Sequence, residues 1–274
     1  MPAGTGPGRL EALVRYICTA GFARGARVSR ITTAMVLAAG LGTRMRPVTD
    51  TVPKPLIKVG GKALMDWPLD EFASAGVTRA VVNVHHLADQ VRAHVAARTT
   101  PGIVISDETA QLLETGGGIL KALPLIGDAP FYAANTDAFT VGSTKPGTAL
   151  MREAFDDNVD VVLLLHPIAQ THGFDGAGDF FMDAQGRLTR RGSATRAPYV
   201  YAGMQLLRPQ VFAGLELKPF SMNPVWDRLI AAGRLKGVAG DGAWFHVGTP
   251  EAIAATDAAL VRMGRAPSGV ISAV

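Results

Sequence analysis

A short stretch near the start of the chain combines backbone freedom with positive charge. Gly40 and Gly42 follow an apolar run, Arg44 comes next, and Lys54 stands between two prolines. Glycines after a strand let bare backbone N–H groups approach phosphate oxygens, and a guanidinium offers a planar fork that matches them. The stretch has neither the Gly-Lys-Ser/Thr of a Walker loop nor the third glycine of a dinucleotide fingerprint. It predicts a ligand that carries several phosphates.

A second candidate for chemistry is the Asn135-Thr-Asp137 element, which follows the apolar residues 130–134. A carboxylate at the end of a buried strand is well placed to bind Mg²⁺, which prefers hard oxygen ligands and takes many of them from phosphates and water. A simple Asx-turn is the alternative interpretation of this element.

The elements that must position these residues alternate between strand-like and helix-like patterns. Near-continuous apolar strands separated by amphipathic helices predict a Rossmann-like α/β fold, with a mostly parallel sheet flanked by helices. The carboxyl ends of such strands share one edge, where ligands bind. The predicted strands are 34–40, 79–85, 102–108, 130–139 and 159–167, and the predicted helices are 63–76, 87–98, 117–126 and 148–158.

The pattern changes after residue 167. Shorter strands there predict a smaller α+β lobe, residues 168–264, that closes over a nucleotide-binding part, residues 34–167, with 265–274 as a tail. The expected elements of the lobe are a hairpin at 178–192, a strand at 197–209, a helix at 223–235, a strand-turn-strand unit at 236–250 and a helix at 250–264.

Composition limits the function classes. The formal net charge of +4 lies in residues 1–33, which hold five arginines and one glutamate, so the remaining chain is nearly neutral and nucleic-acid binding is not expected. No apolar run is long enough to span a membrane. A single cysteine permits no internal disulfide and indicates a cytoplasmic protein. We expect the basic leader 1–33 to be disordered or to lie outside the natural protein, whose start we expect near Val28 or Met35.

Four segments together resemble the sugar-1-phosphate nucleotidyltransferases. They are "LAAGLGTRMRPVTDTVPKPLIKVGGKAL", "LLETGGGILKALPLIGDAPFYAANTDAF", "YAGMQLLRP" and "WFHVGTPEAI", and the resemblance covers about residues 34–263. "ETGGGI" followed by N-x-D is most similar to the N-acetylmuramate-1-phosphate uridylyltransferase branch, which recycles cell-wall sugars. Mannose-1-phosphate guanylyltransferases and related heptose-phosphate enzymes are the alternative branches.

The resemblance implies a nucleotide-diphospho-sugar transferase fold and an enzyme that joins an NTP, here UTP, to a sugar 1-phosphate with release of pyrophosphate. It implies Mg²⁺, or Mn²⁺, as cofactor. Arg44 and Lys54 would be the catalytic cations. The implied nucleotide-binding residues are Ala39, Gly40, Gly42, Thr43, Arg44, Asn83, Glu114, Gly116 and Gly117. The implied sugar-binding residues are Asn135, Asp179 and Gly203, and the implied metal ligands are Asp137 and the residue at position 246.

Position 246 departs from the family pattern, because "WFHVGT" has His246 where the family usually has an aspartate. Imidazole is a poor ligand for Mg²⁺ and a better one for Mn²⁺, Co²⁺ or Zn²⁺. The histidine could coordinate such a metal, contact phosphate or sugar, or simply pack. The departure also keeps open a non-catalytic nucleotide-sugar sensor. The sequence does not decide the base, the sugar or the oligomeric state, and a homo-oligomer is compatible with it.

Overall fold

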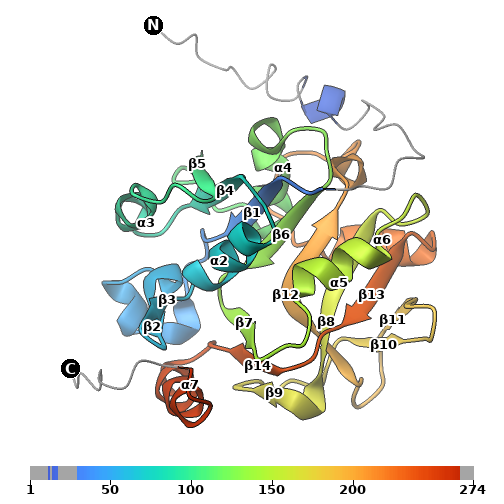
Figure 1. Cartoon of the computed structure of the whole chain (residues 1–274). Helices are drawn as coiled ribbons and strands as arrows, with labels where there is room; N and C mark the ends of the chain where they lie inside the picture. The colour runs from blue at the N-terminus through green and yellow to red at the C-terminus, as the bar shows by residue number, and fades with distance from the viewer. Residues whose placement is uncertain (1–11, 13, 18–29, 266–274) are drawn as a thin grey trace, which may run out of the picture.

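The computed structural model describes Ala12 and residues 14–17 and 30–265 (Figure 1). Its main sheet begins with four parallel strands in the order β5-β4-β1-β6. The chain builds outward from β1 in one direction and then returns to add β6 on the other side. Ligands of α/β sheets bind at the carboxyl ends of strands where the order reverses in this way. These strands are β1 (Thr33–Leu37), β4 (Arg79–Val84), β5 (Gly102–Asp107) and β6 (Phe131–Asn135).

The second part of the chain completes the same sheet. Strand β12 lies antiparallel between β6 and β8, and β13 adds to β8 in parallel. The predicted hairpin at 178–192 is confirmed as β10 and β11, which branch from the start of β12. The main sheet therefore continues across residue 167, where the sequence suggested a boundary between two parts. The strands are β8 (Val161–Pro167), β10 (Phe180–Met182), β11 (Leu188–Arg190), β12 (Tyr199–Leu207) and β13 (Leu235–Ala239).

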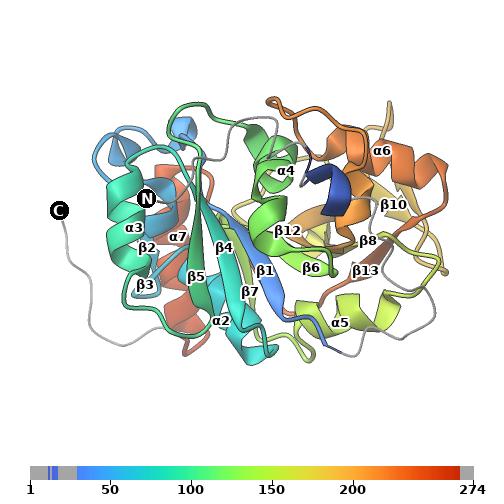
Figure 2. The same cartoon turned by 90° about the horizontal axis from the view of Figure 1, so that it is seen from above.

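Helices cover both faces of the sheet. Alternate side chains of β1 separate the two cores, because Val36 packs on the side of α2, α3 and α5, whereas Met35 packs on the side of α4 and α6. Figure 2 shows α4 and α6 on one side of the sheet and α2 and α5 on the other. Burial on both faces explains why the strands are almost entirely apolar. The helices are α2 (Asp66–Ser74), α3 (Ala88–Val95), α4 (Glu114–Ile126), α5 (Gly147–Ala154) and α6 (Asn223–Ala231).

Smaller elements complete the edge where β1 and β6 end. The two strands expected within 236–250 form, but they belong to different sheets, since β13 pairs with β8 while β14 pairs with β7 and β9. Helix α7 packs against β2, with Leu260 in a third small core. These elements are β2 (Lys58–Val59), β3 (Lys62–Ala63), β7 (Ala138–Val141), β9 (Thr171–His172), β14 (Ala243–His246) and α7 (Pro250–Arg262).

A short part of the leader is helical. Ala12 and residues 14–17 are helical, Ile17 is buried, and Val14 packs against the core on the α4 side. Apolar side chains three positions apart lie on one helical face and can bury together. The disorder expected for the leader otherwise lies outside the described residues. Residues 1–11, 13, 18–29 and 266–274 lie outside the described residues, as do Val28 and Cys18. In the described part of the chain, no helix has the length and apolar character that crossing a membrane requires.

Candidate active site

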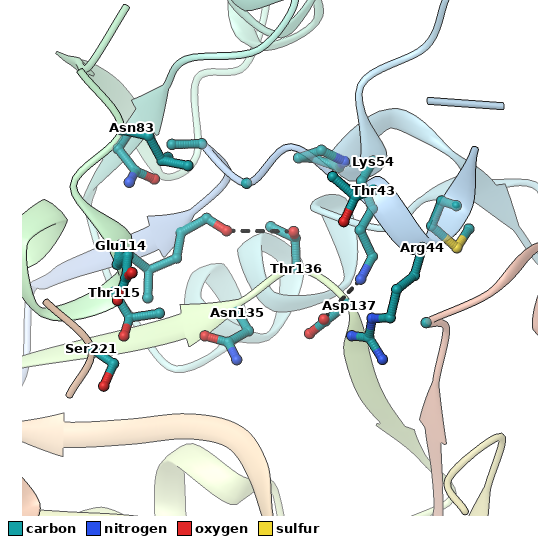
Figure 3. Close-up of a pocket in the computed structure, with 18 residues that line it drawn as sticks. Thr43, Arg44, Lys54, Asn83, Glu114, Thr115, Asn135, Thr136, Asp137 and Ser221 are labelled. Atoms are coloured by element: carbon teal, nitrogen blue, oxygen red, sulfur yellow. Dashed lines mark hydrogen bonds and ion pairs between the residues drawn. The ribbon is translucent and has the colours of Figure 1, made fainter. Parts of the chain in front are cut away.

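A cavity of about 450 Å³ opens at the carboxyl ends of β1, β4 and β6 (Figure 3). This is the edge that the predicted topology assigns to a ligand. Residues from segments far apart in the sequence line it, and most of the residues expected from the sequence are among them. Those expected residues are Ala39, Gly40, Gly42, Thr43, Arg44, Lys54, Asn83, Glu114, Asn135 and Asp137.

The loop after β1 is folded tightly by Gly42. This glycine has φ 63, and a Cβ there would lie 2.9 Å from Cγ2 of Thr49 and 3.0 Å from Cβ of Lys54. The hydroxyl of Thr49 donates a hydrogen bond to the Gly42 carbonyl over 2.9 Å. Only glycine permits both this left-handed conformation and this close approach. The loop thus folds back and brings Lys54 beside the end of β6.

Lys54 and Asp137 form an ion pair inside the cavity. Nζ of Lys54 lies 2.9 Å from Oδ2 of Asp137, and the side chains are 12% and 24% exposed (Figure 3). Burial alone would raise the pKa of Asp137, but the neighbouring His246 imidazole and the Lys54 ammonium outweigh burial and hold that pKa well below its usual range. The carboxylate is therefore charged across the whole neutral pH range.

His246 faces the same carboxylate. Strand β14 pairs with β7 so that His246 lies opposite Ala138, and Nε2 of the ring is 3.8 Å from Oδ2 of Asp137. Nδ1 lies 3.3 Å from the carbonyl oxygen of Gly173, an acceptor, so Nδ1 carries the proton and donates. Nε2 then faces the Asp137 carboxylate, to which it can donate when the ring is protonated and beside which it can bind a metal ion when the ring is neutral. The ring also lies parallel to Trp244, with centroids 5.9 Å apart.

Arg44 is the exposed cation of the site. Its side chain extends from the turn η1 (Thr43–Met45) toward the Asp137 end of the cavity (Figure 3). Within residues 30–265 it forms no ion pair within 4.0 Å, whereas its neighbour Arg46 pairs with Asp50 over 3.3 Å and lies outside the cavity. Arg44 is thus the arginine of this loop that remains available to an anionic ligand.

Asn83 lines the other end of the cavity, but its amide is already engaged. Its Oδ1 accepts a hydrogen bond from the Ala38 N–H over 2.7 Å, and its Nδ2 donates to Oε1 of Glu108 over 2.7 Å. The residue is 2% exposed. One N–H and one lone pair of the amide are therefore used within the protein, and a contact between this side chain and a nucleobase stays a prediction.

Gly116 and Gly117 do not line the cavity. Helix α4 begins at Glu114, three residues before the start expected from the sequence, so both glycines lie in its first turn. Their N–H groups donate to the Phe220 carbonyl over 2.8 and 3.1 Å. A Cβ at Gly116 would lie 2.3 Å from Cε2 of Phe220, and one at Gly117 would lie 2.4 Å from the Lys218 carbonyl. The absence of side chains at these two positions therefore lets the loop at 218–220 pack closely against the helix, and it does not serve a ligand in the cavity. Glu114 does line the cavity.

A smaller cavity of about 120 Å³ adjoins the first beside Asn135. The two cavities share Leu37, Thr115, Asn135 and Ser221 as lining residues. Beyond these, the smaller cavity is enclosed by side chains from β12 and from the start of α6. They are Tyr201, Gln205, Met222, Asn223 and Trp226.

The other two residues expected to bind sugar, Gly203 and Asp179, line neither of these two cavities. Gly203 has φ 88 in the segment of β12 where the register shifts, and a Cβ there would lie 3.6 Å from Cβ of Asn135. Oδ2 of Asp179 accepts a hydrogen bond from the Tyr201 N–H over 2.9 Å, so Asp179 fixes the start of β12 instead.

Several lining residues were not identified from the sequence. Thr115 stands within the "ETGGG" segment, and its hydroxyl accepts the Met222 N–H over 3.0 Å, which brings Ser221 to the cavity. Gly248 lies beside His246 and Arg44, where a Cβ would be 2.6 Å from Cε1 of the histidine. Thr115 could have been found from its motif, but Ser221 reaches the cavity only through tertiary packing.

The sequence is similar to those of known nucleotidyltransferases. The family model described as "Nucleotidyl transferase" matches residues 33–162. A protein of Caulobacter vibrioides named N-acetylmuramate alpha-1-phosphate uridylyltransferase is 46% identical over 83% of this chain and 96% of its own length. A protein of the same name from Neisseria meningitidis is 34% identical, over 79% of this chain and 93% of its own.

More distant relatives have related activities in their names. A mannose-1-phosphate guanyltransferase of Neurospora crassa is 26% identical over 80% of this chain, which spans 61% of that protein. The solved structure of the inositol-1-phosphate CTP transferase from T. maritima has a TM-score of 0.67 at 18% identity, covering 90% of this chain and 99% of that one, and confirms the fold. The chain belongs to the sugar-1-phosphate nucleotidyltransferases, enzymes that transfer a nucleotidyl group to a sugar 1-phosphate.

Proposed function

We propose that this chain transfers a uridylyl group from UTP to N-acetylmuramate α-1-phosphate, releasing pyrophosphate, and that it works in the cytoplasm to reuse cell-wall sugars. The names of the two most similar relatives described above support the choice of substrates. The observation that carries the proposal is the pair of adjoining cavities, one with Arg44, Lys54 and Asp137 at one end and the other reached past Asn135.

In this arrangement the triphosphate lies in the larger cavity and the sugar in the smaller one. A phosphate oxygen of the sugar substrate attacks the α-phosphorus in line, the new P–O bond forms, and the bond to pyrophosphate breaks. The protein contributes mainly by positioning the two phosphates and by neutralising charge. Arg44 holds the departing pyrophosphate, and Lys54 lies between the α-phosphate and the sugar phosphate. The backbone of Gly40, which has open space around its Cα, faces the phosphates.

A divalent metal fits the residues at the end of β6. Asp137 offers a carboxylate, and Nε2 of His246 lies 3.8 Å from it. Adjacent ligands of a six-coordinate ion lie about 3 Å apart and opposite ligands about 4.2 Å apart, so one ion could contact both. In the described residues no group of three or more His, Cys, Asp or Glu side chains could hold a metal without other ligands. That matches an ion that takes its remaining ligands from phosphates, and such an ion would polarise the phosphoryl oxygens.

The ion pair of Lys54 with Asp137 then has a function before the substrates bind. Each group neutralises the other in a cavity where an unpaired charge would be costly. A divalent ion held by Asp137 would neutralise the carboxylate and leave the Lys54 ammonium to the substrate phosphates. We propose that both charges exchange partners when the substrates bind.

The test is release of pyrophosphate from each of four NTPs combined with N-acetylmuramate 1-phosphate, glucose 1-phosphate or mannose 1-phosphate, with Mg²⁺ or Mn²⁺. We expect release only with UTP and the muramate sugar. Release with GTP and mannose 1-phosphate would contradict the proposed substrates in favour of the branch to which the Neurospora relative belongs. UTP binding without release in any combination would favour a non-catalytic sensor. The histidine at position 246, in place of the usual aspartate, would then account for the loss of activity.

A further inference from the structure

A fully buried carboxylate lies behind the cavity. Glu108 follows β5, is 0% exposed, and does not line the cavity itself. Its Oε1 accepts a hydrogen bond from Nδ2 of Asn83 over 2.7 Å, and its Oε2 accepts one from the Leu113 N–H over 3.1 Å. In residues 30–265 it has no ion pair within 4.0 Å. Burying a carboxylate without a neighbouring cation costs folding free energy. We therefore look for a role of Glu108 other than stabilising the fold.

The hydrogen bonds of Glu108 continue through Asn83 to the first loop of the site. Oδ1 of Asn83 accepts from the Ala38 N–H, the first backbone donor after β1. One continuous chain of hydrogen bonds therefore runs from Ala38, through two buried side chains, to Leu113. Ala38 leads into the glycine loop that we assign to the phosphates, and Leu113 leads into Glu114 and Thr115, which line the cavity.

We propose that Glu108 is a positioning residue that sets the spacing between these two segments and thereby the affinity for the nucleotide. This inference rests on the proposed function, since it takes the larger cavity to be the nucleotide site. Glu108 acts through Asn83 and through the Leu113 amide without touching substrate. A buried network whose members are all satisfied is rigid, and it can hold two loops in the geometry that the ligand needs.

The polarity of the network defines the variants that test it. An ionised carboxylate only accepts hydrogen bonds, and both partners of Glu108 are N–H donors. Glu108→Gln keeps the shape but places an NH₂ group against one of these donors. Asn83→Asp removes the donor and sets two carboxylates against each other. The double variant Asn83→Asp/Glu108→Gln restores every hydrogen bond with the direction of the central one reversed.

Binding of UTP to the full-length variants is measured by calorimetry, together with KM for each substrate and the melting temperature. We expect each single variant to weaken UTP binding by about tenfold or more, because a buried group loses its partner. The double variant should recover to within about threefold of wild type, while KM for the sugar phosphate stays constant in all variants. Single variants that bind UTP like wild type, or a double variant no better than the weaker single, would overturn the proposal.

A matched control separates positioning from stability. Tyr132→Phe removes another buried hydrogen bond, from the Tyr132 hydroxyl to the Thr148 carbonyl over 2.9 Å, away from both cavities. We expect it to lower the melting temperature and leave UTP affinity unchanged. A loss of UTP affinity in this variant equal to that of Glu108→Gln would mean that destabilisation alone weakens binding, and the proposal would fail.

A further variant, Gly118→Ala, tests the network even if Glu108→Gln and Asn83→Asp do not fold. A Cβ at Gly118 would lie 2.8 Å from Oε1 of Glu108 and 3.0 Å from Nδ2 of Asn83. Gly118→Ala thus displaces the network without deleting a hydrogen-bonding group, and alanine itself favours the helix. We expect weaker UTP binding in a folded protein, and unchanged binding would count against the network. If wild type binds GTP instead of UTP, the proposed function fails, and the same comparison made with GTP still tests Glu108.

Discussion

The two ends of the larger cavity are held in different ways. At one end, the charges of Lys54 and Asp137 neutralise each other across 2.9 Å, Arg44 is exposed, and Nε2 of His246 faces Asp137. At the other end, Asn83 and Glu108 are buried and hydrogen-bonded to backbone groups. The first end can exchange its partners for those of a ligand, whereas the second is fixed before any ligand arrives. Changes at the first end should therefore affect the chemical step, and changes at the second should affect nucleotide affinity.

The largest effect is expected from Lys54→Met. The variant removes the charge that we place between the two phosphates, and we expect kcat to fall by about 10²–10³-fold, as for other groups that stabilise a transition-state charge. Steady-state pyrophosphate release measures this. Lys58→Met, a change at an exposed lysine on β2, is the matched control and should keep kcat. If both variants lost kcat equally, or neither did, the assignment of the charged end would be wrong.

Arg44→Ala should have the next largest effect, about a hundredfold loss of kcat/KM for the nucleotide, because a preorganised donor to the leaving group is lost. Arg46→Ala is its control, since Arg46 pairs with Asp50 at the surface and lies outside the cavity. The two variants are compared by initial rates at low and high salt. An equal loss in both would show that general positive potential matters rather than the geometry of Arg44.

These charged residues were predicted from the sequence, and their places in the cavity agree with that prediction. Asp137 lies two residues after β6, and Arg44 and Lys54 lie in the segment between β1 and β2, so the strand pattern was sufficient to place them near the shared edge. Asp179, Gly116 and Gly117 were assigned to the site by resemblance, but their positions depend on the start of β12 and on the loop at 218–220. Glu108 was not identified at all, because one glutamate after a strand looks no different from an exposed one.

The strand composition likewise predicted the α/β class and most elements, but not the order of strands. Nothing in the apolar run of β8 indicates that β12 separates it from β6. Strands with two buried faces have few side chains that distinguish one neighbour from another, so this pairing is decided by the whole core.

The smallest effect is expected from a carboxylate in the scaffold, Glu71, which extends the comparison beyond the site. Its side chain accepts the Thr148 N–H over 3.0 Å, and within residues 30–265 it has no ion pair within 4.0 Å. Burial raises its pKa above the ordinary 4.5, against the lowering effect of the hydrogen bonds from Thr148. The folded state thus holds this proton more tightly than the unfolded state does.

Wild type should therefore lose some stability as the pH rises from about 4.5 through the raised pKa of the folded carboxyl. Glu71→Gln removes this dependence and keeps an acceptor for Thr148, so its advantage in unfolding free energy should grow over that window and then stay constant, at less than about 1 kcal/mol. Urea unfolding at a series of pH values measures the difference. A difference that shrinks toward neutral pH would contradict the expected sign.

The antiparallel insertion of β12 between β6 and β8 has a consequence for how the protein can be divided. A chain cut after residue 167 would leave β6 and β8 each with an open edge and unpaired backbone groups, a template for association with other chains. The strand that closes both edges is synthesised more than thirty residues later, at Tyr199–Leu207. The acceptor side is thus needed to close the nucleotide side, and we expect the two to melt in a single calorimetric transition and neither to fold when expressed alone.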